Sequence, residues 1–556
     1  MYNYAQDVGE RICKDATEAI ANRSAYSGHC DEISRLILPS YKNTWYPGNY
    51  NTPGQKNTEE QIDSTAQLAL SRFAAILDSL LTPRNSQWHT LEASDPNLQK
   101  LRSVRLWFED TTRRLFRLRY APTANFASQI NVTWTQLGAF GNGPMFVDRY
   151  LGIDGTVGFR YKALPMGEIY LYENHQGAID GFLRIFQMTA RQAAQQFERY
   201  GQLPQQIIQM NVPGKCETKF TFYHRVQPRS DYDPRRIDAK GKIFASYYVS
   251  ETGKTLVSEG GYRSFPMPCA RYDQEPGTPY ARGPAMMILP ATKTLMAEKK
   301  IVLKTGHRIS DPILLTHDDG LVPNMKPGSV NTGGVNKDGK LLIQPLPMGD
   351  PRIGKELMDD ERAIINDAFL VNLFQVLLND PKVLTATQVV EMANQKGILL
   401  APTVGRQTSE QQGPQIAREL ELGLDMGLFD PMPPELAEAQ GDYQVVYTSP
   451  MARIARSEEN GGFMRSLETT LNVINITQDP APLDLYNLDV ALPEMSRNNG
   501  VPERWMNSED AIAQKRNQRA QQQQAQQDIQ AAPAAAAMLK AQAAIGARTL
   551  QGSKKR

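Results

Sequence analysis

The chain has 556 residues and a mass of 62.2 kDa, more than one hydrophobic core usually supports, so we expect several domains. Hydrophobic residues make up 41% of the chain and charged residues 22%, and no apolar run approaches the roughly 18 residues that cross a bilayer, so we expect no membrane insertion. The formal net charge of +1 excludes a strong long-range attraction to a polyanion, although DNA stays possible as a weakly held cargo.

The N-terminal segment and the cysteines both favour a cytoplasmic place of synthesis. The first residues carry acidic side chains early and lack an uninterrupted apolar core, so they do not have the layout of a secretory signal. The cysteines lie far apart, with no CxxC pair and no histidine cluster to complete a zinc site. We expect isolated, reduced thiols that pack inside the fold, at Cys13, Cys30, Cys216 and Cys269.

Helical periodicity first appears in residues 58–81. Apolar residues recur at steps of three and four from Ile62 to Leu80 and form one face. Thr58 and Gln61 fit a capping box at the start, and Pro83 is expected to end the helix.

A second helix is predicted over Asn97–Arg119. It is rich in arginine, which we interpret as a solvated face or a salt-bridged subunit contact in preference to a DNA-binding patch. The arginines are Arg102, Arg105, Arg113, Arg114, Arg117 and Arg119.

Strand-like patterns follow from Val132 to about residue 265. Val132–Ile185 contains short, aromatic-rich runs separated by glycines, and KFTFYHRVQP and KIFASYYVSETGKTLVSEGGY continue the pattern with a hairpin turn near Gly253. Prolines from Pro266 to Pro284 then predict a connecting loop. Strands and helices together predict an α+β fold.

Two further helices are predicted at Pro290–Leu303 and Pro351–Leu378, and they enclose the Gly- and Pro-rich insert Thr305–Asp350. The insert contains two patterns that predict short strands, ILLTH and KLLIQPL, so we expect an antiparallel helix pair with a small β module at its tip. Apolar residues from Ala368 to Leu378 cover more than one face, which predicts burial on several sides by the chain itself or by neighbouring subunits.

After Met506 the chain is rich in Gln and Ala and poor in large apolar residues. Such a segment has high helix propensity but little to bury, so a helix packed in an assembly and a disordered tail both stay open.

The sequence contains no motif for catalysis or cofactor binding. Gly253-Lys254-Thr255 is the nearest match to a phosphate-binding loop, but Tyr248 stands where the first glycine is needed. The histidines are scattered, and the acidic pairs Asp318–Asp319 and Asp359–Asp360 are more typical of surface or helix-end charges than of a metal site. We therefore assign no catalytic residue, no metal ligand and no cofactor.

Four groups of segments, taken in chain order, resemble one known family. They are LILPSY with DSTAQLALSRFAAILDSLLTPRNSQWHTL, NFASQINVTWTQLGAFGNGPMFVDRY with MGEIYLYENHQGAIDGFLRIFQMTARQAAQQF, YARGPAMMILPATKTLMAEKK with NMKPGSVNTGG, and LTATQVVEMANQKG with YTSPMARIARSEE. Together they resemble the head-to-tail connector, or portal, family of short-tailed bacteriophages (podoviruses). The chain departs from the pattern at Gln388, where many relatives carry Glu, and in the loop-like Ile398–Pro414.

The resemblance implies a portal fold with an α+β wing, an antiparallel helical stem, a small β-rich clip and a C-terminal helical crown. We expect the N-terminal wing part at 1–285, stem helices at 286–306 and 356–380, and the clip at 307–355. Residues 381–500 would form the tunnel loop or helix and the return to the wing, and 501–556 a crown or a disordered tail.

The resemblance also implies a function without catalysis. Such proteins form a ring, expected here to be dodecameric, at one capsid vertex of the virion, and they are made in the cytoplasm of the host bacterium. The ring conducts double-stranded DNA during packaging and ejection. The implied partners are the terminase large subunit, which hydrolyses ATP, the tail adaptor proteins, the capsid and scaffolding proteins, and the internal core or ejection proteins.

Candidate contact residues follow from these assignments. Lys382, Lys396 and Arg406 flank the expected tunnel region and are candidates for weak contacts with DNA phosphates, with surface or intersubunit salt bridges as an equal alternative. The candidates for the clip surface that faces the terminase and tail adaptor are Leu321, Asn324, Lys326, Asn336 and Lys337.

Two other functions remain as alternatives. A different phage structural protein, from the tail or the internal core, would also be large and free of motifs, and only a ring with an axial channel would separate it from a portal. A packaging nuclease or ATPase is disfavoured because the sequence lacks a catalytic constellation.

Overall fold

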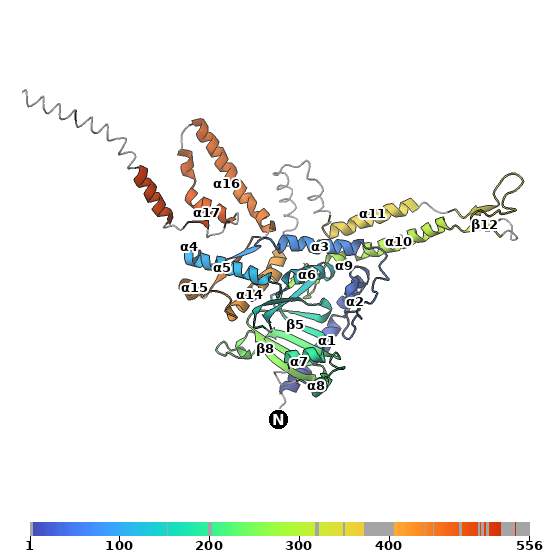
Figure 1. The fold of residues 1–556 in the computed structure, drawn as a ribbon, viewed down its shortest axis with the longest axis horizontal. Coiled ribbons are helices and arrows are strands. Elements are labelled where there is room, and N and C mark those ends of the chain that lie inside the picture. The colour runs from blue at the N-terminus through green and yellow to red at the C-terminus, as the bar shows by residue number, and fades with distance from the viewer. Residues whose placement is uncertain are drawn as a thin grey trace, which may run out of the picture. The chain divides into compact units, whose positions relative to one another are not determined.

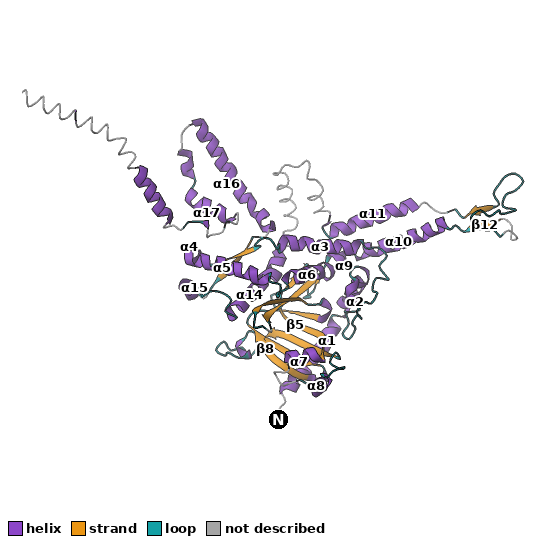
Figure 2. Ribbon diagram, in the orientation of Figure 1, coloured by secondary structure: helices purple, strands orange, loops and turns teal. Residues whose placement is uncertain are grey.

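The computed structural model describes residues 4–152, 154–197, 203–316, 322–347, 351–371, 405–439, 441–448, 450–477, 481–498, 501, 505–507, 511–523 and 540. The chain divides into two compact units. The first comprises Met1–Thr90, Thr111–Asp430 and Val445–Gly461, and the second comprises Leu91–Asp110, Pro431–Gln444 and Gly462–Arg556. Helices and antiparallel sheets occur together, which confirms the predicted α+β class (Figure 2).

A five-stranded antiparallel sheet forms the centre of the first unit (Figure 1). Each strand pairs antiparallel with its neighbour in sequence. The strands lie in the order β4 (Ile169–Glu173), β5 (Ile179–Thr189), β6 (Lys219–Pro228), β7 (Phe244–Ser250) and β8 (Thr255–Tyr262). The hairpin predicted near Gly253 is confirmed, with φ of 81° at this glycine between β7 and β8.

Helices cover both faces of this sheet. On one face, α1 (Tyr4–Asn22) places Val8, Ile12 and Ala16 against Leu183 and its neighbours, because residues four apart share one side of a helix. On the other face lie α7 (Ala190–Phe197) and α8 (Gln205–Met210). Successive side chains of β5 point to opposite faces of the sheet, because side chains alternate along a strand. Ile185 packs on the α1 side and Phe186 on the α7–α8 side, so this sheet is buried on both sides.

A second sheet and two helices complete this core. The sheet has the order β3 (Val157–Ala163), β2 (Asn142–Leu151) and β9 (Cys269–Arg271). Helix α6 (Phe126–Phe140) packs on β2 and β3, and α3 (Thr65–Leu81) packs on α6. Gly141 ends α6 with φ of 74° and approaches the carbonyl oxygen of Ala281 so closely that no Cβ fits between them.

The remaining elements of the first unit are short or connect the layers. They are α2 (Ser24–Leu36), α9 (Pro284–Met287), α14 (Gly413–Asp425), β10 (Asp273–Gln274) and β11 (Ala281–Arg282), the 3₁₀ turns η1 (Pro39–Tyr41), η2 (Met166–Glu168), η4 (Ala239–Gly241) and η5 (Thr252–Lys254), and the π-helical turn η6 (Thr408–Gln412). Helix α14 packs on β2, where Arg418 Nε donates to the carbonyl oxygen of Val147 at 3.3 Å.

A helical hairpin extends from the first unit. Helix α10 (Leu289–Ser310) and helix α11 (Pro351–Ala368) lie side by side, and β12 (Leu314–Thr316) pairs with β13 (Ile343–Pro345) at their far ends (Figure 1). The predicted arrangement of helix, β insert and helix is therefore confirmed.

Several predicted boundaries are wrong. The first helix starts at Thr65 and not near Thr58, and Asp63 lies just before it, where its Oδ1 accepts a hydrogen bond from Thr65 N at 2.8 Å. The segment 132–140 belongs to α6 and not to the strand region, since Ile130, Trp134 and Leu137 are buried at helical spacing. The predicted single helix Asn97–Arg119 is interrupted at Leu101, whose ψ of 122° is extended.

Two further predictions around the hairpin are corrected. Helix α11 ends at Ala368 and does not continue to Leu378, because Leu370 has a left-handed φ of 60° that interrupts a right-handed helix. Phe369 and Val371 are buried, as the apolar pattern predicts, while 372–378 lie outside the described residues. The part of the loop-like Ile398–Pro414 that the structure describes, from Gly405 on, is helical.

The second unit is helical over most of its described residues. It contains α4 (Pro96–Lys100), α15 (Pro434–Glu438), the turn η7 (Ala481–Leu485), α17 (Leu488–Asn498) and the Gln-rich residues 511–523, which are helical. Helices α5 (Arg102–Arg119) and α16 (Pro450–Thr477) and strands β1 (His89–Ala93) and β14 (Tyr443–Tyr447) cross between the units. Within the second unit, Phe463 packs edge-on against Tyr486, and Arg516 pairs with Asp489.

The four cysteines are unpaired, as the sequence predicts. Cys30 and Cys269 are buried, and burial raises the pKa of the Cys269 thiol to about 12, so it is a protonated packing residue at neutral pH. In the part of the chain that the structure describes, no helix has the length and apolar character of a membrane span.

A buried ion pair links the end of α5 to α14. The side chains of Arg119 and Glu419 are both 0% exposed, and Arg119 Nε donates to Glu419 Oε1 at 3.1 Å. Glu419 Oε1 also accepts from the hydroxyl of Tyr161 and the amide of Gln415, both at 2.7 Å. Burial and the adjacent Arg119 charge hold the pKa of His89 well below its ordinary value, so this neighbouring ring stays neutral.

We expect Glu419→Gln to destabilise the first unit by about 3–5 kcal/mol, because it keeps the shape but leaves Arg119 buried without a countercharge. The midpoint of urea unfolding, followed by tyrosine and tryptophan fluorescence, measures this loss. Glu217→Gln is the matched control, since Glu217 pairs with Arg191 at the surface and such pairs contribute about 1 kcal/mol or less. Equal midpoints for the two variants would contradict the assigned role of the buried pair.

Candidate functional site

The helical hairpin is the first candidate site, because it presents a β insert away from the sheets (Figure 1). Its helices are antiparallel: Gly354 of α11 lies against the side chain of Val302, and Arg362 meets Lys299 at a common carboxylate. At the tip, Leu315 of β12 pairs with Gln344 of β13. The hairpin is therefore a pair of packed antiparallel helices that carries a small β module at its tip.

The common carboxylate at the base of the hairpin is Asp63, which is 4% exposed. It accepts hydrogen bonds from Lys299 Nζ at 2.9 Å and Arg362 Nη2 at 3.0 Å, and its other oxygen accepts from Thr65 N. Burial raises the pKa of Asp63, but the hydrogen bonds from Thr65, Lys299 and Arg362 lower it by a larger amount. The pKa of Asp63 therefore lies well below its usual range. One ionised side chain thus fixes α3, α10 and α11 together.

The β insert has almost no core of its own. Among its described residues, 311–316 and 322–347, only Gly334 is buried. Apolar side chains are instead exposed along it, at Ile313, Leu315, Val322, Met325, Val330, Val335 and Leu341. Exposed apolar residues at this density are typical of a surface that another chain covers.

The predicted clip residues fall on two turns of this insert. Asn324 and Asn336 hold the turns: the carbonyl oxygen of Asn324 accepts from Ser329 Oγ at 2.6 Å, and Asn336 Oδ1 accepts from Lys337 N at 2.7 Å. Lys326 and Lys337 are exposed on the same turns. Leu321, the fifth candidate, lies outside the described residues.

Only one of the three predicted channel residues can be placed. Lys382 and Lys396 lie outside the described residues. Arg406 is half-buried, and its Nη1 donates to the carbonyl oxygen of Tyr272 at 2.8 Å. This contact holds Arg406 to its own chain, and its contact with DNA stays a prediction.

The two hairpin helices carry opposite net charges. Helix α10 has five Lys and Arg against one Glu, a net charge of +4, and α11 has five Asp and Glu against three Lys and Arg, a net charge of −2. Counting charges per helix in the sequence would have revealed this asymmetry. The hairpin therefore consists of one basic and one acidic helix.

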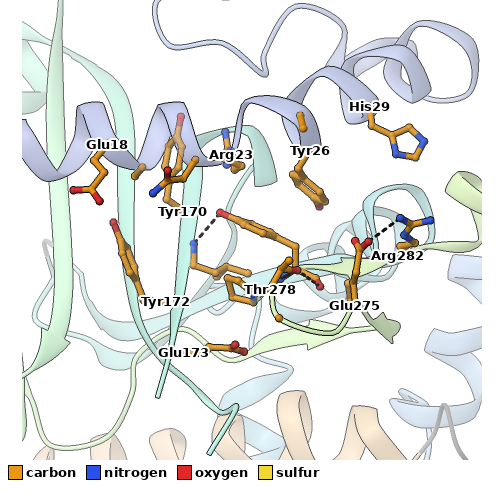
Figure 3. Close-up of a pocket in the computed structure, with 18 of the residues that line it drawn as sticks. Glu18, Arg23, Tyr26, His29, Tyr170, Tyr172, Glu173, Glu275, Thr278 and Arg282 are labelled. Atoms are coloured by element: carbon orange, nitrogen blue, oxygen red, sulfur yellow. Dashed lines mark hydrogen bonds and ion pairs between the residues drawn. The ribbon is translucent and has the colours of Figure 1, made fainter. Parts of the chain in front are cut away.

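A cavity of about 810 Å³ is a second candidate site (Figure 3). It lies between α1–α2 and the edge strand β4, with the 275–282 loop as a further wall. Tyrosines and charged side chains line it, including Tyr26, Tyr170, Tyr172, Glu18 and Glu173. Its walls come from segments far apart in the chain, such as those that hold Tyr26 and Met286, so local sequence patterns could not reveal it.

No metal site is visible within the described ranges, because no three His, Cys, Asp or Glu side chains converge there. Asp359 of the acidic pair Asp359–Asp360 forms an ion pair with Arg362 at 2.9 Å. The pair Asp318–Asp319 lies outside the described residues.

Comparison with known proteins reveals relatives along nearly the whole chain. A family model described as bacteriophage head to tail connecting protein matches residues 10–506. The portal protein of Salmonella phage epsilon15 is 26% identical over 544 residues, which cover 96% of this chain and 95% of that protein. The probable portal protein of Bordetella phage BPP-1 is 26% identical over 529 residues, covering 91% and 90%. A chain of the virion of a native gene transfer agent particle covers 72% of this chain and 83% of its own length, but its TM-score of 0.32 and identity of 11% carry no argument.

We expect Asp63→Asn to lower the stability of the hairpin base by about 1–3 kcal/mol at pH 7, since it removes charge-assisted hydrogen bonds. A carboxyl group whose pKa is lowered by folding stabilises the folded state fully above its unfolded pKa of about 3.9. This stabilisation is lost as the pH falls through the pKa of the folded state. The difference between wild type and variant should therefore persist from pH 7 to pH 5 and shrink below about pH 4. Thermal unfolding at each pH measures it, with the exposed Asp273→Asn as the control that should show no such difference.

Proposed function

Because the chain belongs to the family of bacteriophage head-to-tail connecting proteins, we propose that it works as a portal protein in a ring of identical copies at one capsid vertex. Double-stranded DNA passes through the ring during packaging and ejection, and the terminase large subunit and the tail adaptor dock on it in turn. Capsid, scaffolding and internal core or ejection proteins contact other parts of the ring. As a member of this family the chain is a structural component and not an enzyme.

The observation that best supports docking is the insert without a core. An arm fixed at its base by Asp63 carries a module whose apolar side chains are exposed in the single chain. We assign the hairpin helices to the stem, at 286–306 and 356–380, and the insert to the clip, at 307–355. The 1–285 segment then forms the wing, with 381–500 as the tunnel region and wing return and 501–556 as the crown or tail.

The hairpin also supports a ring. Both helices expose apolar side chains that a neighbour would cover, among them Ile301 of α10, which is 63% exposed, and Ile364 of α11, which is 52% exposed. The opposite net charges of the two helices favour an arrangement in which α10 of one copy faces α11 of the next. Head-to-tail contacts of this kind close into rings when the rotation between copies divides a full turn.

Passage of DNA requires weak contacts, and the charge balance is compatible with that. Each phosphate that a Lys or Arg neutralises adds affinity, so a strongly basic channel would hold the duplex in place. A net charge of +1 for the whole chain permits such weak contacts. Lys382, Lys396 and Arg406 remain our candidates for such contacts, and Arg406 would have to release the carbonyl of Tyr272 to make one.

We expect Lys300→Glu with Lys304→Glu to abolish rings, because the exposed basic edge of α10 would then repel the acidic edge of α11 in the next copy. Electron microscopy of the purified protein shows the outcome. Adding Glu356→Lys with Asp360→Lys on α11 should restore rings, because α10 is then acidic and α11 of the next copy is basic.

The control for this experiment is Lys14→Glu with Lys219→Glu, which changes the net charge equally at exposed sites outside the hairpin. It should form rings like the wild type. If the α10 variant still forms rings, the charge pairing between α10 and α11 is refuted but the portal function is not. If the wild-type protein forms no rings under any condition, the portal function is refuted and a tail or internal core protein is favoured.

We expect deletion of Val322–Lys340 to leave rings intact but to prevent binding of the tail adaptor, because β12 and β13 stay outside the deletion and the exposed turns are lost. Ring images and co-sedimentation with the adaptor measure the two effects separately. Lys326→Ala with Lys337→Ala should weaken binding, while Lys14→Ala with Lys219→Ala should not. Normal tail attachment to the deletion variant would overturn the assignment of the clip.

A further inference from the structure

The connection between β6 and β7, residues 229–243, is a surface loop that its own residues hold in shape. Arg236 Nε donates to Asp238 Oδ1 at 3.1 Å. Gly241 is required in this loop, because a Cβ there would lie 1.7 Å from the carbonyl oxygen of Arg236. We call residues 229–243 the anchor loop.

Arg229 ties the anchor loop to β8, which is an edge strand of the five-stranded sheet. Its side chain is 1% exposed and donates to Glu259 Oε1 and to the carbonyl oxygen of Gly260, both at 3.0 Å. The loop therefore takes its shape without a partner. A contact made by such a loop loses little conformational entropy on binding.

The anchor loop presents one apolar side chain completely to solvent. Ile237 is 100% exposed, and Tyr232 and Ile243 of the same loop are also exposed. Single exposed apolar residues are common on protein surfaces. Ile237 differs from these because it stands between Arg236 and Asp238, whose side chains hold the loop in place. A fixed apolar side chain that enters a pocket is a typical anchor of a protein interface.

A small cavity beside the start of β4 can accept such a side chain. Its volume of about 200 Å³ is below the range of roughly 300–1,000 Å³ that small-molecule sites occupy, but it is sufficient for one aliphatic side chain. Glu168 in this cavity pairs with Arg184 at 2.8 Å, so its charge is neutralised. We call this space the β4 cavity, and its apolar and aromatic lining residues are Tyr41, Tyr46, Pro47, Tyr50, Pro165 and Ile185.

The anchor loop and the β4 cavity cannot meet within one chain. β4 and β8 are the two edge strands of the sheet, with β5, β6 and β7 between them. The cavity adjoins β4 at Glu168, whereas Arg229 ties the loop to β8. A fixed apolar side chain at one edge and a cavity at the other suit a heterologous contact, in which two different surfaces of the same protein meet.

Charge also favours a second copy of the chain as the occupant. The anchor loop has five Lys and Arg against three Asp, a net charge of +2, and its exposed Arg235 forms no ion pair with a described residue. Burial raises the pKa of Tyr50 to about 12, and the charge of Glu168 adds to this rise. Arg184 opposes the rise and Glu251 adds to it, so Glu251 lies within electrostatic reach of the cavity. Glu251 is exposed and forms no ion pair with a described residue, which makes the rim of the cavity acidic.

We propose that Ile237 of one copy enters the β4 cavity of the next copy, with Arg235 beside Glu251. This contact rests on the ring that we propose above, and it adds a second head-to-tail contact to that of the hairpins. It joins the first unit of each copy to the first unit of the next.

The test is cross-linking of the full-length protein with a short bismaleimide after Ile237→Cys and Tyr46→Cys are combined. We expect a ladder of covalent dimers, trimers and larger species, because each copy offers one cysteine to each of two neighbours. Ile237→Cys alone and Tyr46→Cys alone should give no ladder, and they also report any reaction of the native thiols. Rings that yield no ladder, or that yield dimers alone, would overturn the proposal and leave the portal function standing. A wild-type protein without rings would overturn both.

A second test measures the strength of the contact. Ile237→Asp should weaken the association between copies about tenfold or more, since a charge replaces an apolar side chain in the cavity, while Ile237→Val should retain it. Mass photometry of rings at decreasing protein concentration measures this change.

The matched control is Leu151→Asp, which adds the same charge at another exposed apolar position, 71% exposed, and should assemble as the wild type does. Equal weakening by the two Asp variants would contradict the assigned contact. Because Ile237 is fully exposed in the single chain, the separated copies of Ile237→Asp and wild type should melt at the same temperature. This comparison separates a lost contact from lost folding.

Discussion

The buried ion pair of Arg119 and Glu419 is the contact on which the packing of the first unit depends. It brings the last turn of α5 to α14, and it recruits Tyr161 of β3 through a shared carboxylate oxygen. Both charges are fully removed from water, so either one alone would be costly to bury, and the two segments must fold against each other for the pair to form. The rings of Trp88 and Phe116 add cation–π contacts with the guanidinium, at 4.5 and 4.7 Å.

Asp63 applies the same principle at the base of the hairpin. Its carboxylate binds Lys299 and Arg362, so the direction of the arm is tied to the start of α3. The tip of the arm has the opposite character, because its described residues bury almost nothing. A fixed base with an open tip is compatible with the docking role that we propose for the hairpin.

Local patterns predicted part of the fold, but not the N-terminal helices α1 and α2. The strand alternation from residue 142 onward, the hairpin turn at Gly253 and the helix pair around a β insert are all present. The failures occur where a distant contact decides. Asp63, just before α3, pairs with residues over 230 positions away, and residues 132–140 belong to α6 and not to the predicted strand region because the apolar side of this helix packs on β2 and β3. Of the predicted clip residues, Asn324, Lys326, Asn336 and Lys337 lie on exposed turns, whereas Leu321 and the predicted channel residues other than Arg406 lie outside the described residues.

The sequence by itself determined the classes of element, their order and the family resemblance, because periodicity, turn residues and motif order act between near neighbours or along the chain. Only the tertiary structure decided which charged side chains form ion pairs. Glu419 and Asp63 are buried and paired, whereas Asp15 and Glu18 face a cavity without a partner among the described residues. Nothing in their local sequence distinguishes these carboxylates, since the partners of a side chain are set by segments that only the folded chain brings together.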